Sequence, residues 1–179
     1  MADLKKIYLT ETKPKLQKDL KIKNPMAVPQ LSKIVVNVGV RNAVGDKKGV
    51  PAVSDILGQI TGQKPKVTKA KKSIAQFKLR QGDKIGVVVT MRGKRMYNFY
   101  DKLVNVVLPR IKDFHGVKKD SFDPRGNYTL GVIEYSVFPE IDTGKIDRIQ
   151  GLEISIVTTA RNKEEGQALL TALGMPFQK

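Results

Sequence analysis

Residues 64–95 limit the fold more than any other part of the sequence. These 32 residues hold eight lysines, three arginines and one acid, Asp83, so they carry a net charge of +10 out of +16 for the whole chain. Apolar residues interrupt the cations at the two-residue spacing of a β-strand, as at Val87, Val89 and Met91. Cations carried on ordered strands favour a surface that binds a polyanion such as a nucleic acid, and a solvated charged face is the simpler alternative.

The bulk composition agrees with nucleic-acid binding and excludes several other classes of protein. The isoelectric point is near 10.0, and 179 residues with 40% apolar content predict a single domain with a real core. No apolar run is long enough for a membrane span, and the first residues lack the apolar region of a signal peptide, so a cytoplasmic protein without membrane contact is expected. The absence of cysteine excludes disulfides and thiolate zinc sites, and we predict no cofactor and no metal.

The positive charge is unevenly distributed along the chain. Residues 120–179 hold six lysines and arginines against nine acids, a net charge of −3. The N-terminal two thirds therefore carry the whole positive surplus and are expected to meet phosphate. The acid-rich remainder is suited to contact with a basic protein.

Hydrophobic periodicity predicts alternating helices and strands. We expect helices at 2–22, 48–61, 94–108 and from Asn162 onward, and strands at 31–40, 63–70, 85–92, 129–138 and 152–161. Thr12 is predicted to cap a second helical piece, and Asn162 with Glu165 resembles a capping box. The 63–70 strand is expected at a sheet edge, because Pro65 cannot donate to a ladder and fits only an edge or a strand start. We predict one domain over residues 1–179, with an N-terminal helical extension at 1–23 and a protruding, mobile basic loop at 73–84.

These elements predict a two-layer α+β fold with a mostly antiparallel sheet of four or five strands. In the 31–40 strand, Ile34, Val36 and Val38 share one parity and form a core face, while Asn37 lies on the other. Helices are expected on the core face, which leaves the opposite face open for RNA. This open face is expected to be lined by Asn37, Gln63, Thr90 and Arg92. It lacks the exposed aromatic pair on which some RNA-binding sheets stack bases.

Other chemistry has weaker support in the sequence. Residues 39–49 lie between a strand and a helix, as phosphate loops do, but their glycine and lysine spacing does not fit a Walker loop. A solvent turn is the simpler interpretation. Asp142, Gly144 and Asp147 weakly resemble a cation loop, and an acid–base pair could come from Glu134, Glu140, Glu153 and Asp142, although surface charge is the simpler interpretation. His115 is a candidate catalytic base or a loop hydrogen-bonder, and Tyr97, Phe99 and Tyr100 are candidates for base stacking or for helix-core packing. A small nuclease or nucleotide-binding enzyme would need several carboxylates or a phosphate loop beside the basic stretch. Asp83 is the one acid in residues 64–95.

Several long strings resemble the bacterial form of the large-subunit ribosomal protein L-five family. They are NPMAVPQLSKIVVNVGV at 24–40, TGQKPKVTKAKKSIAQFKLRQGDKIGVVVTMRG at 61–93, RMYNFYDKLVNVVLPRIKDF at 95–114, SFDPRGNYTLGVIEYSVFPE at 121–140 and TALGMPF at 171–177. The resemblance covers nearly the whole chain. It implies a structural RNA-binding protein of the large subunit rather than an enzyme.

The resemblance also implies partners and roles for particular residues. The family binds 5S rRNA and helps seat it in the central protuberance beside 23S rRNA. It also approaches the P-site tRNA and reaches protein S-thirteen of the small-subunit head. The protein is expected to be monomeric outside the ribosome. Carried onto this chain, the 5S rRNA-binding residues are Asn37, Gln63, Lys64, Lys66, Lys69, Lys71, Lys72, Thr90 and Arg92. The loop that points at tRNA contains Ser73, Gln76, Phe77, Lys78 and Arg80.

Overall fold

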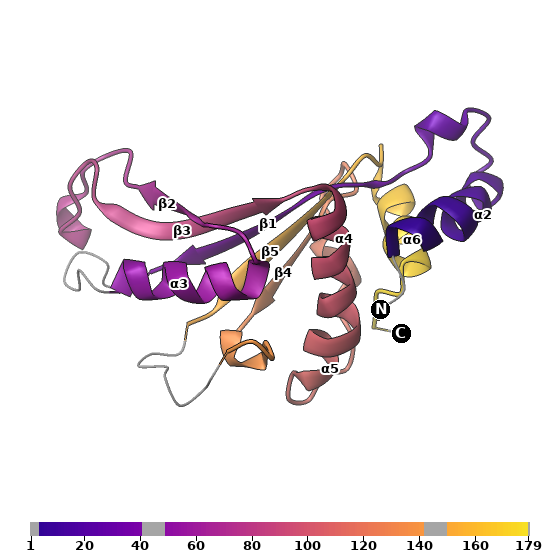
Figure 1. Ribbon diagram of the computed structural model, residues 1–179. Helices are drawn as coiled ribbons and strands as arrows, with labels where there is room; N and C mark the ends of the chain where they lie inside the picture. Colours follow the sequence, from indigo (N-terminus) through magenta and orange to yellow (C-terminus); the bar gives the residue numbers. More distant parts are fainter. Residues whose placement is uncertain (1–3, 41–48, 142–149, 179) are drawn as a thin grey trace. The chain divides into compact units, whose positions relative to one another are not determined.

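A computed structural model describes residues 4–40, 49–141 and 150–178 of the chain. The helices are α1 (Leu4–Ile7), α2 (Lys13–Asp19), α3 (Gly49–Thr61), α4 (Gly93–Lys102), α5 (Leu108–Arg110) and α6 (Lys163–Ala172), and the strands are β1 (Leu31–Gly39), β2 (Lys66–Lys69), β3 (Lys84–Met91), β4 (Tyr128–Val132) and β5 (Leu152–Thr158). The strands form one antiparallel sheet in the order β2-β3-β1-β5-β4 (Figure 1). The predicted α+β class, the strand number and the edge position of β2 are confirmed.

The chain divides into two compact units. Unit 1 contains Met1–Ile34, Met91–Leu130 and Ser155–Lys179, and unit 2 contains Val35–Thr90 and Gly131–Ile154. Each unit is therefore assembled from segments that are distant in sequence. The single-domain prediction and its N-terminal extension stay predictions.

Unit 2 places α3 along one face of the neighbouring strands β1 and β3 (Figure 1). The alternation of each strand decides which residues are covered. Val36 and Val38 of β1 are buried together with Val87 and Val89 of β3, whereas Asn37 is exposed. The stripe of α3 that sequence periodicity predicts is buried as well, and Gly62 ends the helix at a φ of 63°. The core face and the open face of unit 2 are thus confirmed.

Unit 1 builds its core mainly from helices. α4 continues through a π-helical turn, Leu103–Val107, into α5, and this long helix buries Tyr97, Phe99 and Tyr100. The Tyr100 hydroxyl donates a hydrogen bond to the carbonyl of Leu170 in α6, 3.4 Å away. Helix-core packing, rather than base stacking, is therefore the role of these aromatic residues. Desolvation raises the pKa of both Tyr97 and Tyr100.

The N-terminal helices belong to the core of unit 1. α1 contacts α4 and α2 contacts α6, and a π-helical turn, Tyr8–Thr12, joins α1 to α2. Thr12 is buried, has helical backbone angles and makes no side-chain cap hydrogen bond, so the predicted cap at Thr12 is wrong. The helix continues through this position because Tyr8, Thr12 and Leu16 recur at i, i+4 and i+8 on its buried side.

Two other sequence predictions have mixed outcomes. Asn162 accepts a hydrogen bond from the backbone N–H of Glu165 at 2.9 Å, which confirms it as the cap of α6. The predicted 129–138 strand is too long, because β4 ends at Val132 and a 3-10 turn occupies Tyr135–Val137. Ile133, at the end of the strand, is 84% exposed. A bend at Ile133 and the 3-10 turn that follows it therefore end the strand although the apolar alternation continues.

The buried hydroxyl of Tyr8 offers a test of how firmly the N-terminal helices are held. This hydroxyl donates to the Pro29 carbonyl at 2.8 Å, and its removal leaves a buried acceptor unpaired. Tyr8→Phe is therefore expected to lower the free energy of unfolding by about 1–2 kcal/mol, measured by urea unfolding at pH 7. A variant as stable as the parent would mean that the bond is unimportant for packing.

The same substitution has an expected pH signature. Desolvation, together with the charge of Tyr97, raises the pKa of Tyr8 from 10.0 to about 12. A raised pKa in the folded state gives stability that is complete below pH 10 and is lost as the pH rises toward the folded value. Between pH 9 and pH 11, the free energy of unfolding measured with urea should fall less in Tyr8→Phe than in the parent chain.

Candidate nucleic-acid interface

Asn37 is the polar centre of the open face of unit 2. It lies in the middle of β1, and its side chain is exposed and makes no hydrogen bond to any other described residue. Val35 on β1 and Val88 on the adjacent strand β3 share this face and are half-buried. An amide presents both a donor and an acceptor, so Asn37 can pair with a base edge or a ribose hydroxyl.

Gln63 and Thr90 are brought together at the same end of unit 2. The Gln63 side-chain amide nitrogen donates to the backbone carbonyl of Thr90 at 3.2 Å, and both residues are half-buried. This bond ties the segment after α3 to the last residues of β3. One role of Gln63 is therefore structural, while its side-chain carbonyl oxygen remains available as an acceptor.

The cations are carried by a hairpin that we call the basic hairpin, residues 64–84. β2 pairs antiparallel with β3, with Lys66 opposite Val88 and Lys69 opposite Lys84, and an irregularity separates Thr68 from Lys69. Such a bulge re-aims the side chain that follows it. The predicted phosphate-binding lysines are all exposed; they are Lys64, Lys66, Lys69, Lys71 and Lys72.

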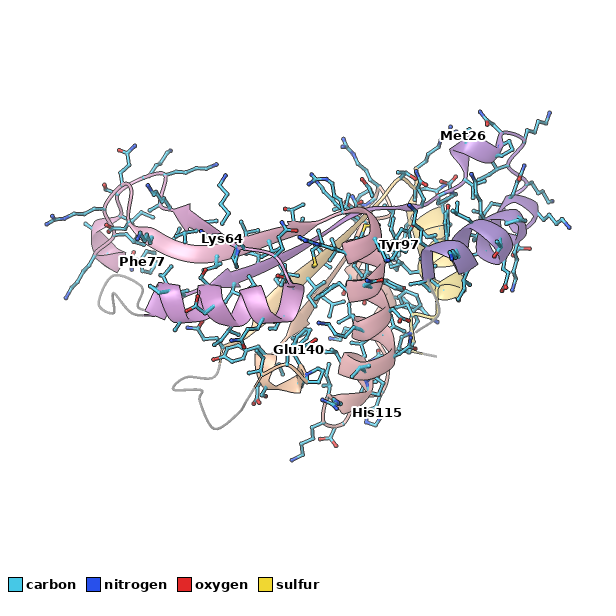
Figure 2. The ribbon with its side chains drawn as sticks, in the orientation of Figure 1. Met26, Lys64, Phe77, Tyr97, His115 and Glu140 are labelled. Atoms are coloured by element: carbon cyan, nitrogen blue, oxygen red, sulfur yellow. The ribbon has the colours of Figure 1, made fainter. Side chains whose placement is uncertain are left out.

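The tip of the basic hairpin is closed by its own hydrogen bonds. Ile74 and Leu79 pair through two backbone bonds, of 2.9 and 3.1 Å. Ser73 accepts from the Gln81 N–H at 2.9 Å through its hydroxyl oxygen, and Lys78 takes a left-handed backbone with a φ of 51°. Phe77 stays 64% exposed, and Figure 2 shows it at the end of the hairpin remote from Lys64. The tip thus presents an aromatic side chain among cations.

The one acid in the basic hairpin is already engaged. The Asp83 carboxylate accepts from the backbone N–H of Arg80 at 2.8 Å, so it helps to shape the turn. Gln76, Lys78 and Arg80 have exposed side chains. Little negative charge therefore opposes the approach of a phosphate backbone to this hairpin.

The predicted residues are divided between the two units. Asn37, Gln63, Thr90, the lysines and the tip belong to unit 2, whereas Arg92 belongs to unit 1, where it is exposed and precedes α4. The structure therefore brings Gln63 and Thr90 into direct contact and places the other unit 2 residues on one hairpin and one strand face.

Sequence reasoning missed the importance of Gly86. A Cβ atom at this position would lie 2.7 Å from the Val38 carbonyl oxygen and 2.9 Å from the Thr68 Oγ1 atom. Glycine therefore lets β1, β2 and β3 approach closely at this position. An isolated glycine inside a run of β-branched residues was the available signal.

Some of the residues of the alternative sites lie in the described part of the chain. Residues 4–40, 49–141 and 150–178 contain no group of acids and histidine that could hold a metal ion, and none of their helices is long and apolar enough to cross a membrane. His115 is exposed in a loop. Most of the 39–49 segment, and Asp142, Gly144 and Asp147, lie outside the described residues.

Comparison with known proteins identifies the family. The family model "Ribosomal protein L5" matches residues 24–80, and the model of the C-terminus of the same ribosomal family matches residues 84–177. The chain is 56% identical over 178 residues to "Large ribosomal subunit protein uL5" of Herpetosiphon aurantiacus, covering 99% of each chain. It is 54% identical to the proteins of the same name from Syntrophotalea carbinolica, covering 99% of this chain and 97% of the other, and Desulfatibacillum aliphaticivorans, covering 100% of both. The chain therefore belongs to the ribosomal protein L5 family and is a structural constituent of the large ribosomal subunit, not an enzyme.

Proposed function

We propose that the chain binds 5S rRNA through the open face and basic hairpin of unit 2 and helps to seat it beside 23S rRNA in the central protuberance. The observation that carries this proposal is the exposed Asn37 amide on a strand face whose neighbouring hairpin is lined by exposed lysines. The lysines supply sequence-independent attraction to phosphate, and Asn37, with the remaining groups of Gln63 and Thr90, selects the shape of the RNA.

Binding dominated by phosphate neutralisation has a measurable salt dependence. If about six phosphates are neutralised, the log–log slope of affinity against salt concentration is expected to be about −4 to −5. A mobility-shift titration with a 5S rRNA transcript, against a mixture of other ribosomal RNAs, measures both the slope and the preference. Equal affinity for all the RNAs would rule out the proposal.

The two kinds of contact are distinguishable by substitution. Asn37→Ala is expected to weaken binding to 5S rRNA by about 5- to 100-fold, because a polar partner buried in the complex loses its hydrogen bond. Lys66→Ala should cost less and should make the salt slope shallower by about one, because it removes one screened charge.

Binding to an unrelated structured RNA is the control for this pair. Asn37→Ala should leave that affinity unchanged, while Lys66→Ala should weaken binding to both RNAs by similar factors. An Asn37→Ala variant that loses affinity for the two RNAs equally would show that the open face does not select the RNA.

The tip of the basic hairpin is suited to a second RNA, which we infer to be the P-site tRNA. Phe77 is exposed and lies between Gln76 and Lys78, with Arg80 close by in sequence. An aromatic ring can stack on an unpaired base or a ribose while the cations hold the backbone. The internal hydrogen bonds of the tip reduce the entropy that ordering would cost.

The acid-rich part of unit 2 is suited to the basic protein S-thirteen of the small-subunit head. Ile133 is 84% exposed at the end of β4, and Glu153 is exposed on the neighbouring strand β5. The Glu134 carboxylate accepts from the Ser136 hydroxyl at 2.9 Å, which fixes its orientation. An apolar anchor bordered by carboxylates favours a cationic protein surface over RNA.

A further inference from the structure

Three loops of unit 1 are joined into one structure. We call them the loop cluster; they are residues 21–30, 123–127 and 159–162. Gln30 and Thr159 exchange two hydrogen bonds, from the Gln30 N–H to the Thr159 hydroxyl at 3.0 Å and from the Thr159 N–H to the Gln30 carbonyl at 2.9 Å. Thr158 donates through its hydroxyl to the Gly126 carbonyl at 2.9 Å. These bonds hold together segments that lie far apart in sequence.

The packing between the loops is close as well as hydrogen-bonded. A Cβ atom at Gly126, whose φ is 74°, would lie 2.7 Å from the Ala160 Cβ atom. The Asn127 side-chain oxygen accepts from the Thr158 N–H at 3.0 Å. The cluster is therefore preformed, and a ligand would not need to order it.

The loop cluster exposes positive charge. Its cations are Lys21, Lys23, Arg125 and Arg161, all with exposed side chains, and its one acid is Asp123. Two of these cations are arginines, whose planar guanidinium groups bind phosphate in a bidentate manner.

Asp123 offsets one of these four positive charges, and its hydrogen bonds shape the turn in which it lies. It accepts three hydrogen bonds, from the Arg125 N–H at 3.0 Å and from the backbone N–H and side-chain amide of Asn127, both at 2.7 Å. Desolvation raises the pKa of Asp123, but the hydrogen bonds from Asn127 and Arg125, with the charge of Arg125, lower it overall. Glu165, next to the cluster, accepts from the Arg161 backbone N–H at 2.9 Å and adds a second negative charge at its border.

Met26 is the apolar element of the cluster. Its side chain is 84% exposed, and Figure 2 shows it projecting from the turn beyond the N-terminal helices. The Asn24 side-chain oxygen accepts from the Met26 N–H at 2.9 Å and holds the turn in place. A single exposed methionine gives too little apolar area for a stable protein interface, but it can pack against a ribose or an unstacked base.

We propose that the loop cluster is a second RNA-binding surface, located in unit 1 and separate from the residues of unit 2 described above. Lys21, Lys23, Arg125 and Arg161 contact the phosphate backbone of ribosomal RNA, and Met26 packs against a sugar or base. The proposal rests on the chain being an RNA-binding protein and not on which face of unit 2 binds 5S rRNA. An acidic protein at the same place is the competing partner.

The test uses the full chain with two probes, a 5S rRNA transcript and protein-free 23S rRNA. The variant Lys23→Glu/Arg125→Glu/Arg161→Glu is compared with Lys5→Glu/Lys6→Glu/Lys15→Glu, which changes the net charge equally at exposed positions of unit 1 outside the cluster. Hydroxyl-radical footprinting is expected to show a set of protected nucleotides that the first variant loses and the second retains. The log–log salt slope of the first variant should become shallower by about 2–3.

Met26→Ala provides a second variant that keeps the fold, because the side chain is exposed in the free chain. It is expected to weaken RNA binding by about 3- to 10-fold without changing the urea midpoint. The proposal is overturned if both cluster variants bind and protect both RNAs as the parent chain does, which is also the result expected if the partner is an acidic protein. If the parent chain shows no preference for 5S rRNA, the function proposed for unit 2 is wrong. The comparison of the cluster variants with the parent chain on 23S rRNA would still test the loop cluster.

Discussion

Gly86→Ala is expected to lower the free energy of unfolding by about 2–4 kcal/mol, because β1, β2 and β3 of unit 2 can no longer approach as closely. The new methyl group would meet the Val38 carbonyl oxygen at 2.7 Å, and that oxygen belongs to the backbone of a central strand. Relief requires β3 to move away from β1, which weakens the sheet on which Asn37 and the basic hairpin are positioned. Urea unfolding, together with amide hydrogen exchange across residues 35–40 and 84–90, measures the effect.

Two further variants separate this steric effect from a general effect of losing glycine. Gly131→Ala places its methyl group in open space on β4 and should change stability by less than about 1 kcal/mol. Thr68→Ala combined with Gly86→Ala removes the nearby hydroxyl but leaves the carbonyl contact, so the double variant should remain unstable. A Gly86→Ala variant as stable as Gly131→Ala would contradict the close approach.

The second large effect is expected from charge reversal on the basic hairpin. Lys66→Glu/Lys69→Glu/Lys71→Glu should weaken binding to 5S rRNA by at least about 100-fold near physiological salt, because three phosphate contacts are lost and three repulsions are introduced. The salt dependence should become shallower by about 2–3 slope units. Fluorescence anisotropy with labelled 5S rRNA at several salt concentrations gives both quantities.

The matched control again reverses three exposed lysines on the N-terminal helices, Lys5, Lys6 and Lys15. Both triple variants have the same net charge, so a difference between them reports position and not total charge. If both lose affinity equally, binding depends only on the overall positive field of the protein. The urea midpoints of both should stay near that of the parent, because exposed side chains contribute little to stability.

The sequence predicted the parts of the fold that depend on local periodicity. Alternation placed Val36 and Val38 in the core and Asn37 on the open face, and helical spacing identified the buried side of α3. These predictions succeeded because one residue period decides which face is buried. The same periodicity explains why the predicted cap at Thr12 is wrong, because the buried stripe from Tyr8 to Leu16 continues through Thr12.

Features that depend on contacts between distant segments could not be predicted in this way. The close approach at Gly86 involves Val38 and Thr68, and the loop cluster joins Gln30 to Thr159. Nothing in the local pattern around these residues specifies the partner. Likewise, the Gln63 side chain was expected to meet RNA, but part of its hydrogen-bonding capacity is used by the Thr90 carbonyl. The strand pattern placed Asn37, Gln63, Thr90 and Arg92 on the open face, and the family resemblance supplied the roles in binding 5S rRNA and tRNA, which remain predictions.

The interleaving of the two units has a consequence for synthesis. A chain leaves the ribosome amino end first, so unit 2 has all of its segments once Ile154 has emerged. Unit 1 must wait longer, because the Tyr100 hydroxyl finds its acceptor only when Leu170 appears. We therefore expect the nascent chain to fold unit 2, with its basic hairpin, while the apolar core of unit 1 is still incomplete.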